Sequence, residues 1–104
     1  MNIILDESHE ICDKMQRDAY AETISELMSE NKNIVLLDAD LATTVNMTTV
    51  MERYPDRSFN CGIAEANMIS IATGLSLTGK IPSAHTFACF ASRRACDQIF
   101  ISAC

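Results

Sequence analysis

The residues with the clearest capacity for chemistry lie in the second half of the chain. Glu65 stands in segment 60–68, directly before apolar residues with helical spacing, so we expect its carboxylate in the first turn of a helix. There it could cap free amides, favoured by the helix dipole. It could also lie in a partly apolar setting, where its proton affinity rises and it exchanges protons with a ligand nitrogen. The spacing alone leaves both roles open.

A second group follows at His85, Phe87 and Phe90. The two phenylalanines are three residues apart, so at a helix start they share one face and could hold a flat ring between them. Packing in the core is the alternative for such a pair, and the spacing does not decide. We interpret His85 as a strand-end histidine with satisfied hydrogen bonds rather than as a catalytic residue.

Alternating helices and strands are predicted to position these groups. The apolar run 34–37 reads as a strand buried on both faces, and it ends at Asp38 and Asp40. In open α/β sheets, ligands bind at the carboxyl ends of the strands. The order predicts an α/β fold with a parallel sheet flanked by helices. The predicted helices are 13–31, 48–53, 64–77 (ended by Gly79) and 90–103, and the predicted strands are 34–37, 58–61 and 80–84.

Composition excludes several classes of function. The net charge is −6 and the eight basic residues are scattered, which argues against nucleic-acid binding. No run approaches the roughly 18 apolar residues of a membrane span, and no signal peptide is recognised, so we expect a cytoplasmic protein without a membrane partner. The five cysteines have no C-x-x-C spacing, and most are predicted to be small buried residues rather than zinc ligands.

Several motifs agree in order and spacing with one known family. GIAEANM, at 62–68, and GLSLTGKIPSAHTFACFASRRACDQI, at 74–99, resemble the pyrimidine-binding domain of the transketolase family. Upstream, IVLLDADLATT resembles the family's strand that ends in an aspartate, and RSFNCGIAE its approach to the glutamate. The resemblance implies a thiamine-diphosphate-binding fold, here incomplete. It predicts a flexible lead at 1–12 and a partial pyrimidine-binding domain at 13–104, the N-terminal fragment of the C-terminal subunit of a split transketolase.

The resemblance also implies roles for individual residues. In the family, thiamine diphosphate lies between two subunits, and a matching glutamate, here Glu65, hydrogen-bonds ring nitrogen N1′ and promotes loss of the thiazolium C2 proton. Phe87 and Phe90 match the aromatic pair around the aminopyrimidine. The remaining cofactor-binding candidates are matched by position: Asp40 near the thiazolium and the substrate, Ile63 at the pyrimidine, and Arg93 near the ring.

Part of the family's site is missing. The Gly-Asp-Gly motif that, with a later Asn, binds diphosphate and Mg²⁺ does not occur, so both are expected on a partner domain or subunit. The expected function is the pyrimidine-binding half of a transketolase. Paired in a homo- or hetero-oligomer such as a dimer, it would transfer two-carbon ketol units between sugar phosphates of the pentose phosphate type, and alone it would be inactive. The alternatives are a non-catalytic interaction fragment, or a related thiamine enzyme such as deoxyxylulose-phosphate synthase.

Overall fold

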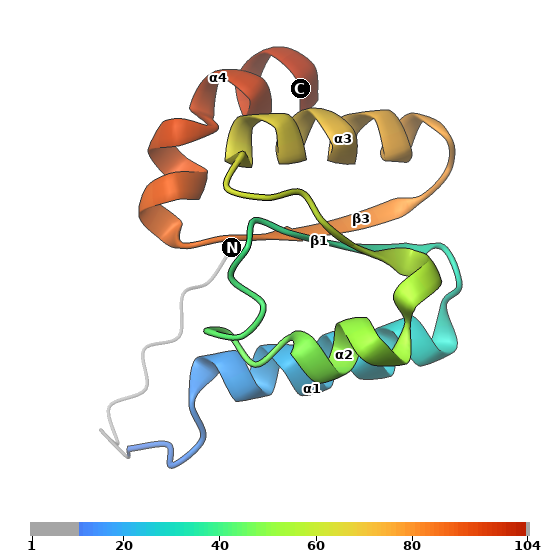
Figure 1. Ribbon diagram of the computed structural model, residues 1–104, viewed down its shortest axis with the longest axis vertical. Helices are drawn as coiled ribbons and strands as arrows, with labels where there is room; N and C mark the ends of the chain where they lie inside the picture. Colours follow the sequence, from blue (N-terminus) through green and yellow to red (C-terminus); the bar gives the residue numbers. More distant parts are fainter. Residues whose placement is uncertain (1–10, 104) are drawn as a thin grey trace, which may run out of the picture.

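A computed structural model describes residues 11–103. Three parallel strands form one sheet in the order β2-β1-β3, with β1 (Ile34–Asp38) between β2 (Ser58–Asn60) and β3 (Ile81–His85). Helices α1 (Gln16–Glu30) and α2 (Thr48–Arg53) lie on one side of the sheet. On the other lie α3 (Glu65–Leu77) and the C-terminal helical segments (Figure 1). The prediction of a parallel sheet flanked by helices is therefore confirmed.

The buried run of β1 divides into two cores because its side chains alternate between the faces of the sheet. On the α1 and α2 side, the core is formed by Ile24, Met28, Ile34, Leu36, Met47 and Val50. On the α3 side, the core is formed by Val35, Leu37, Ala39 and Met68. All five residues of β1 are buried, as expected for a strand covered on both faces.

The predicted element boundaries agree with the structure to within three residues except near the C-terminus. Helix α3 ends at Leu77, as predicted, and the predicted Gly79 follows its C-cap with a φ of +82°, the left-handed conformation that glycine adopts without a Cβ penalty. The Gly79 and Lys80 amides donate to the carbonyls of Ser76 and Leu75, at 3.0 and 3.1 Å, which closes the last turn. Residues 1–10 of the predicted flexible lead lie outside the described range.

The continuous helix predicted over 90–103 is wrong. The segment consists of π-helical turns at Phe90–Arg94 and Ile99–Ala103 around the short helix α4 (Cys96–Gln98). The break falls at the fully buried Ala95, whose amide donates to the Phe90 carbonyl, five residues back, at 3.2 Å. The wide turn changes the direction of the side chains that precede it, and such turns occur often at functional sites.

The cysteine prediction is also wrong where the structure tests it. Cys12, Cys89 and Cys96 are exposed and Cys61 is half-buried. Cys89 directly precedes the first π-helical turn and Cys96 begins α4, and in the described part of this stretch only Ala95 is buried. Among residues 11–103, no helix is long and apolar enough to cross a membrane.

Candidate functional site

Glu65 is the first residue of α3, and a short turn after β2 places it there. Asn60 Oδ1 accepts the Gly62 amide at 2.8 Å, and Gly62 has a φ of +74°, which favours glycine. The Ala64 amide then donates to the Gly62 carbonyl at 2.8 Å. This turn directs the chain from the strand end into α3 and leaves Glu65 only 1% exposed.

The buried Glu65 carboxylate has a basic partner from a distant part of the sequence. Arg94 Nη1 donates to both Glu65 oxygens, each at 3.0 Å. The Arg94 guanidinium also lies over the Phe90 ring, 4.2 Å from its centroid, within the range of a cation–π contact. The Arg94 side chain is 48% exposed, so this ion pair joins a buried group to one that reaches solvent.

The environment of Glu65 lowers the pKa of its carboxyl, mainly through a hydrogen bond from its own backbone amide. The hydrogen bond and the charge of Arg94 act in the same direction, and together these effects outweigh burial, which raises the pKa. The expected rise in proton affinity is therefore not found in the chain alone. The structure places the carboxylate at the start of α3, where its own backbone amide and Arg94 stabilise the ionised form and where it faces a cavity. Its proton exchange with a ligand nitrogen stays a prediction.

That cavity has a volume of about 280 Å³ and lies at the carboxyl end of β1. Its lining brings together four of the six predicted cofactor-binding residues with Arg94 and two apolar neighbours: Ala39, Asp40, Leu41, Ile63, Glu65, Phe90 and Arg94. The volume is slightly below the roughly 300–1,000 Å³ of sites for whole small ligands, so it suits one ring of a larger ligand. A carboxylate, an aromatic ring and apolar walls are the groups that would hold a nitrogen heterocycle.

The other two predicted residues lie beside this cavity. The rings of Phe87 and Phe90 have centroids 5.9 Å apart and are tilted by 30° to each other. Neither phenylalanine is buried, so among the described residues they are not core. Arg93 lines a neighbouring hollow with Cys89, Phe90 and Arg94 instead of facing Glu65.

Asp40 is held at the cavity rim by a contact between two strand ends. Its φ of +62° is unusual for a residue other than glycine, and its Oδ1 accepts a hydrogen bond from Asn60 Nδ2 at 3.0 Å. The contact joins the loop after β1 to the end of β2. Asp40 is exposed, and its role toward the thiazolium stays a prediction.

Arg94 is the site residue that the sequence reasoning missed. The adjacent pair Arg93–Arg94 lies in the matched motif, and the match by position named Arg93 alone as a candidate. One signal could have found it: Arg94 is four residues after Phe90, the spacing that places two side chains on one helical face. An arginine so placed can stack on the aromatic ring and reach the acid beyond it.

A second buried carboxylate, Asp38, lies at the end of β1 and is fully buried. Both of its oxygens lie 3.1 Å from the amide of Leu41, and Oδ1 is 2.8 Å from Nε2 of His85, its register partner on β3. The His85 N–H does not point along this line, so the contact is close but not a straight hydrogen bond. Burial lowers the pKa of His85 and outweighs the opposing charge of Asp38. The position at the end of β3 agrees with the strand-end interpretation of His85, but the expected satisfied hydrogen bonds are not found, because neither ring nitrogen has a hydrogen-bond partner among the described residues.

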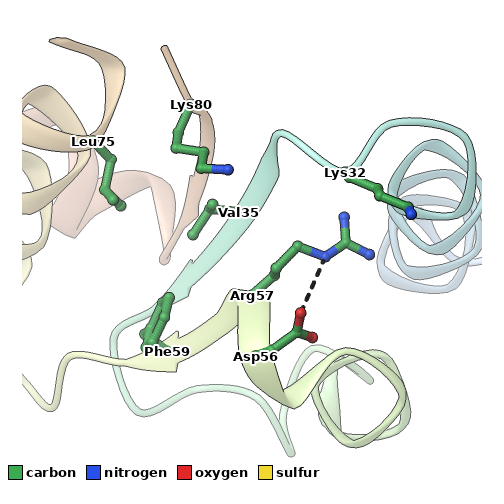
Figure 2. Close-up of a pocket in the computed structure, with 7 residues that line it drawn as sticks. All are labelled: Lys32, Val35, Asp56, Arg57, Phe59, Leu75 and Lys80. Atoms are coloured by element: carbon green, nitrogen blue, oxygen red, sulfur yellow. Dashed lines mark ion pairs between the residues drawn. The ribbon is translucent and has the colours of Figure 1, made fainter. Parts of the chain in front are cut away.

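A larger cavity, of about 510 Å³, lies toward the amino ends of the strands (Figure 2). Val35, Phe59 and Leu75 form its apolar part, and basic side chains stand around it. Arg57 donates to the carbonyls of Met28 and Asn31, at 3.1 and 3.0 Å, so it caps the end of α1. This cavity has more volume but lacks a buried acid, and we place the candidate site at the opposite end of the sheet.

No group of three or more His, Cys, Asp or Glu side chains within residues 11–103 could hold a metal ion. The described residues fit one end of a cofactor, a ring with a basic nitrogen. They offer no counterpart for a metal-bound diphosphate.

Comparison with known proteins gives the family context. The family model described as "Transketolase, pyrimidine binding domain" matches residues 13–104. The 6-deoxy-6-sulfo-D-fructose transketolase subunit SqwH of Clostridium sp. (strain MSTE9) is 44% identical over 86 residues, 83% of this chain and 27% of that protein. A putative transketolase C-terminal section of Methanocaldococcus jannaschii is 45% identical over 86 residues, with the same coverage of 83% and 27%.

A solved structure has the same fold. It is described as a split gene transketolase, inactive beta4 tetramer, and superimposes with a TM-score of 0.74 at 48% identity. The match covers 83% of this chain and 29% of that one. The chain thus spans less than a third of the length of each of these relatives.

Proposed function

The chain belongs to the transketolase family, through its pyrimidine-binding domain, and from this premise we propose that it supplies the pyrimidine half of a thiamine-diphosphate site. In the complete assembly, this site transfers two-carbon ketol units between sugar phosphates. The observation that carries the proposal is the buried Glu65 carboxylate at the start of α3, facing a cavity lined by Phe90 and Ile63.

Glu65 is the catalytic residue of this proposal. Its carboxylate is fixed by the first turn of α3, so one oxygen can share a proton with ring nitrogen N1′ of an aminopyrimidine. In a site of low dielectric, such a hydrogen bond is stronger than in water. When bound, thiamine diphosphate supplies the electron sink for breaking the carbon–carbon bond.

The apolar residues orient the ring and exclude water. Phe90 and Ile63 line the cavity, and the Phe87 ring lies beside the Phe90 ring. Asp40 stands at the rim, where we assign it to the thiazolium and substrate side. The part played by Arg93 remains a prediction from its position in the sequence.

The diphosphate and Mg²⁺ require groups that the described residues do not provide. We therefore assign them to a diphosphate-binding domain on another subunit. The descriptions of the relatives as a subunit, a C-terminal section and a split gene product support this arrangement. We further propose that the assembly is an oligomer that works in the cytoplasm.

The test is the Glu65→Gln variant, assembled with the diphosphate-binding subunit. The amide keeps the shape but cannot share a proton in the same way, so exchange of the cofactor's C2 proton should slow by at least about 100-fold. The exchange runs in deuterated solvent and is stopped by quenching at successive times. Proton NMR then measures the C2–H signal that remains. Glu52→Gln, on an exposed position of α2, removes the same charge away from the site and should leave the rate unchanged.

Two results separate this proposal from the alternatives. If C2 exchange in Glu65→Gln equals that of the unmodified assembly, the role of Glu65 is wrong. If the assembly binds thiamine diphosphate but never exchanges C2–H, the interaction-fragment alternative is correct. Turnover with pyruvate as donor instead of a ketose phosphate would favour the deoxyxylulose-phosphate synthase alternative.

A further inference from the structure

The ion pair between Arg94 and Glu65 occupies the position that the proposed ligand must take. One guanidinium nitrogen bridges both carboxylate oxygens at 3.0 Å, so each oxygen of Glu65 accepts from Arg94. The same guanidinium lies 4.2 Å from the centroid of the Phe90 ring and lines the cavity with it. An aromatic ring bound between Glu65 and Phe90 would compete with Arg94 for both groups.

The two partners differ in their freedom to move. Glu65 is buried at the first residue of α3, whereas nearly half of the Arg94 side chain is exposed. Arg94 also precedes the break at Ala95 and lies in a wide π-helical turn. Release of the pair therefore requires a rotation of Arg94 toward solvent and no displacement of α3.

We propose that Arg94 is a positioning residue that holds the Glu65 carboxylate toward the cavity and is displaced from both Glu65 and Phe90 when an aminopyrimidine ring binds. This inference rests on the proposed function, because it names the residue that controls the same site. Arg94 is the only basic residue in the cavity lining formed by the described residues, and the lining also contains two acids, Glu65 and Asp40.

The exchange has a defined proton balance. Before binding, Glu65 is a carboxylate paired with a guanidinium. After binding, one proton lies between Glu65 and the ring nitrogen, and the guanidinium is solvated and still charged. The shared proton therefore comes from solvent, about one for each ring bound at neutral pH.

The first experiment follows Glu65 in the full chain without cofactor. Carbon-13 NMR of glutamate labelled at the side-chain carboxyl gives the titration of Glu65, assigned by the loss of its signal in Glu65→Gln. Arg94→Gln should raise the pKa of Glu65, because a charge-assisted hydrogen bond to the ionised form is lost. Arg53→Gln is the matched control, since Arg53 also stacks on an aromatic ring, Tyr54, but lies on α2. An unchanged pKa of Glu65 in a folded Arg94→Gln chain would overturn the proposal.

The second experiment measures binding of thiamine diphosphate to the assembly with the diphosphate-binding subunit. Calorimetry in buffers of different ionisation enthalpy should show uptake of about one proton by the unmodified protein. In Arg94→Gln the uptake should decline at a higher pH on the acidic side, because the raised pKa of Glu65 lets the free chain protonate earlier. Binding should tighten by about two- to fivefold because a surface-reaching ion pair no longer competes. A structural role would instead weaken binding and leave the pH profile in place. Zero uptake in the unmodified assembly contradicts the proton shared between Glu65 and the bound ring.

Failure of this inference is distinguishable from failure of the proposed function. If Glu65→Gln abolishes C2 exchange while Arg94→Gln changes neither titration nor proton uptake, only the role of Arg94 is wrong. If Glu65→Gln retains C2 exchange, the proposed function fails, and the cofactor-free titration still reports whether Arg94 controls the charge of Glu65.

Discussion

The described chain buries two carboxylates at the same end of its sheet, and their surroundings differ. Asp38 is enclosed by protein: the Leu41 amide, the His85 ring and the β1 backbone surround it, and none of its contacts reaches solvent through a charged side chain. Glu65 is equally buried, but its partner Arg94 is half exposed and both face a cavity. An enclosed acid stabilises one arrangement of strands, whereas an acid whose partner can leave is available to a ligand. Burial alone therefore does not identify the functional carboxylate.

The largest effect expected from this comparison is on stability. Asp38→Asn should lower the free energy of unfolding by about 2 kcal/mol, because it replaces one of the two carboxylate oxygens that accept from the Leu41 amide with an N–H donor. Glu65→Gln should cost less, since Arg94 can turn into solvent when its partner is neutral. Urea denaturation of the two isosteric variants measures the difference. Equal losses would show that both acids serve the fold in the same way.

A smaller effect is expected in the pH dependence. Burial lowers the pKa of His85, so below about pH 6.5 the unfolded chain takes up a proton that the folded chain resists. The stability associated with neutral His85 is thus fully present above pH 6.5 and is lost as the pH falls toward the lower pKa of the folded state. Between pH 7 and 5.5, His85→Gln should flatten the curve of unfolding free energy against pH by at most about 1.4 kcal/mol per pH unit.

The control for this measurement is Glu65→Gln. The pKa of Glu65 is lowered from an ordinary value of 4.5, so its contribution is lost only at more acidic pH. This variant should keep the slope of the unmodified chain between pH 7 and 5.5. A His85→Gln curve with that same slope would mean that His85 titrates alike in the folded and unfolded chains.

The sequence predicted the sheet and most of its helices because their signals are local. The buried run of β1 and the glycine that ends α3 are readable from a few neighbouring residues, and both lie where expected. The carboxyl-end rule and the family motifs together predicted that Asp40, Ile63, Glu65 and Phe90 would meet, and one cavity contains all four. Their roles toward a cofactor are predictions that the structure does not test.

What the sequence did not predict depends on contacts across the chain. The π-helical turns around Ala95 follow from packing against α3, and no periodicity marks them. Those turns determine that Arg94 and not Arg93 meets Glu65. The pair adds to the lowering of the Glu65 pKa, which comes mainly from the backbone amide of Glu65 itself. The π-helical turns around Ala95 therefore explain two features that the sequence did not predict: the presence of Arg94 in the site and its contribution to the lowered pKa of Glu65.

The smallest predicted effect concerns the contact of Tyr20 with Ser83 and His85, which lies on the Asp38 side of the site. The Tyr20 hydroxyl and Ser83 Oγ form a hydrogen bond of 2.9 Å between α1 and β3, and the Tyr20 ring stands edge-on to His85, 5.9 Å away. Tyr20→Phe should lower the free energy of unfolding by about 1 kcal/mol, because the partly buried Ser83 hydroxyl loses its partner.

Ser83→Ala should lower the free energy of unfolding by a similar amount. The double variant should lose less than the sum of the two single variants, since no hydroxyl then remains unpaired. Strictly additive losses, measured by urea denaturation, would show that the hydrogen bond does not couple the two elements. The C2 exchange rate of the Tyr20→Phe assembly should remain unchanged, because Tyr20 contacts Ser83 and His85 beside Asp38 and does not line the cavity that Glu65 faces.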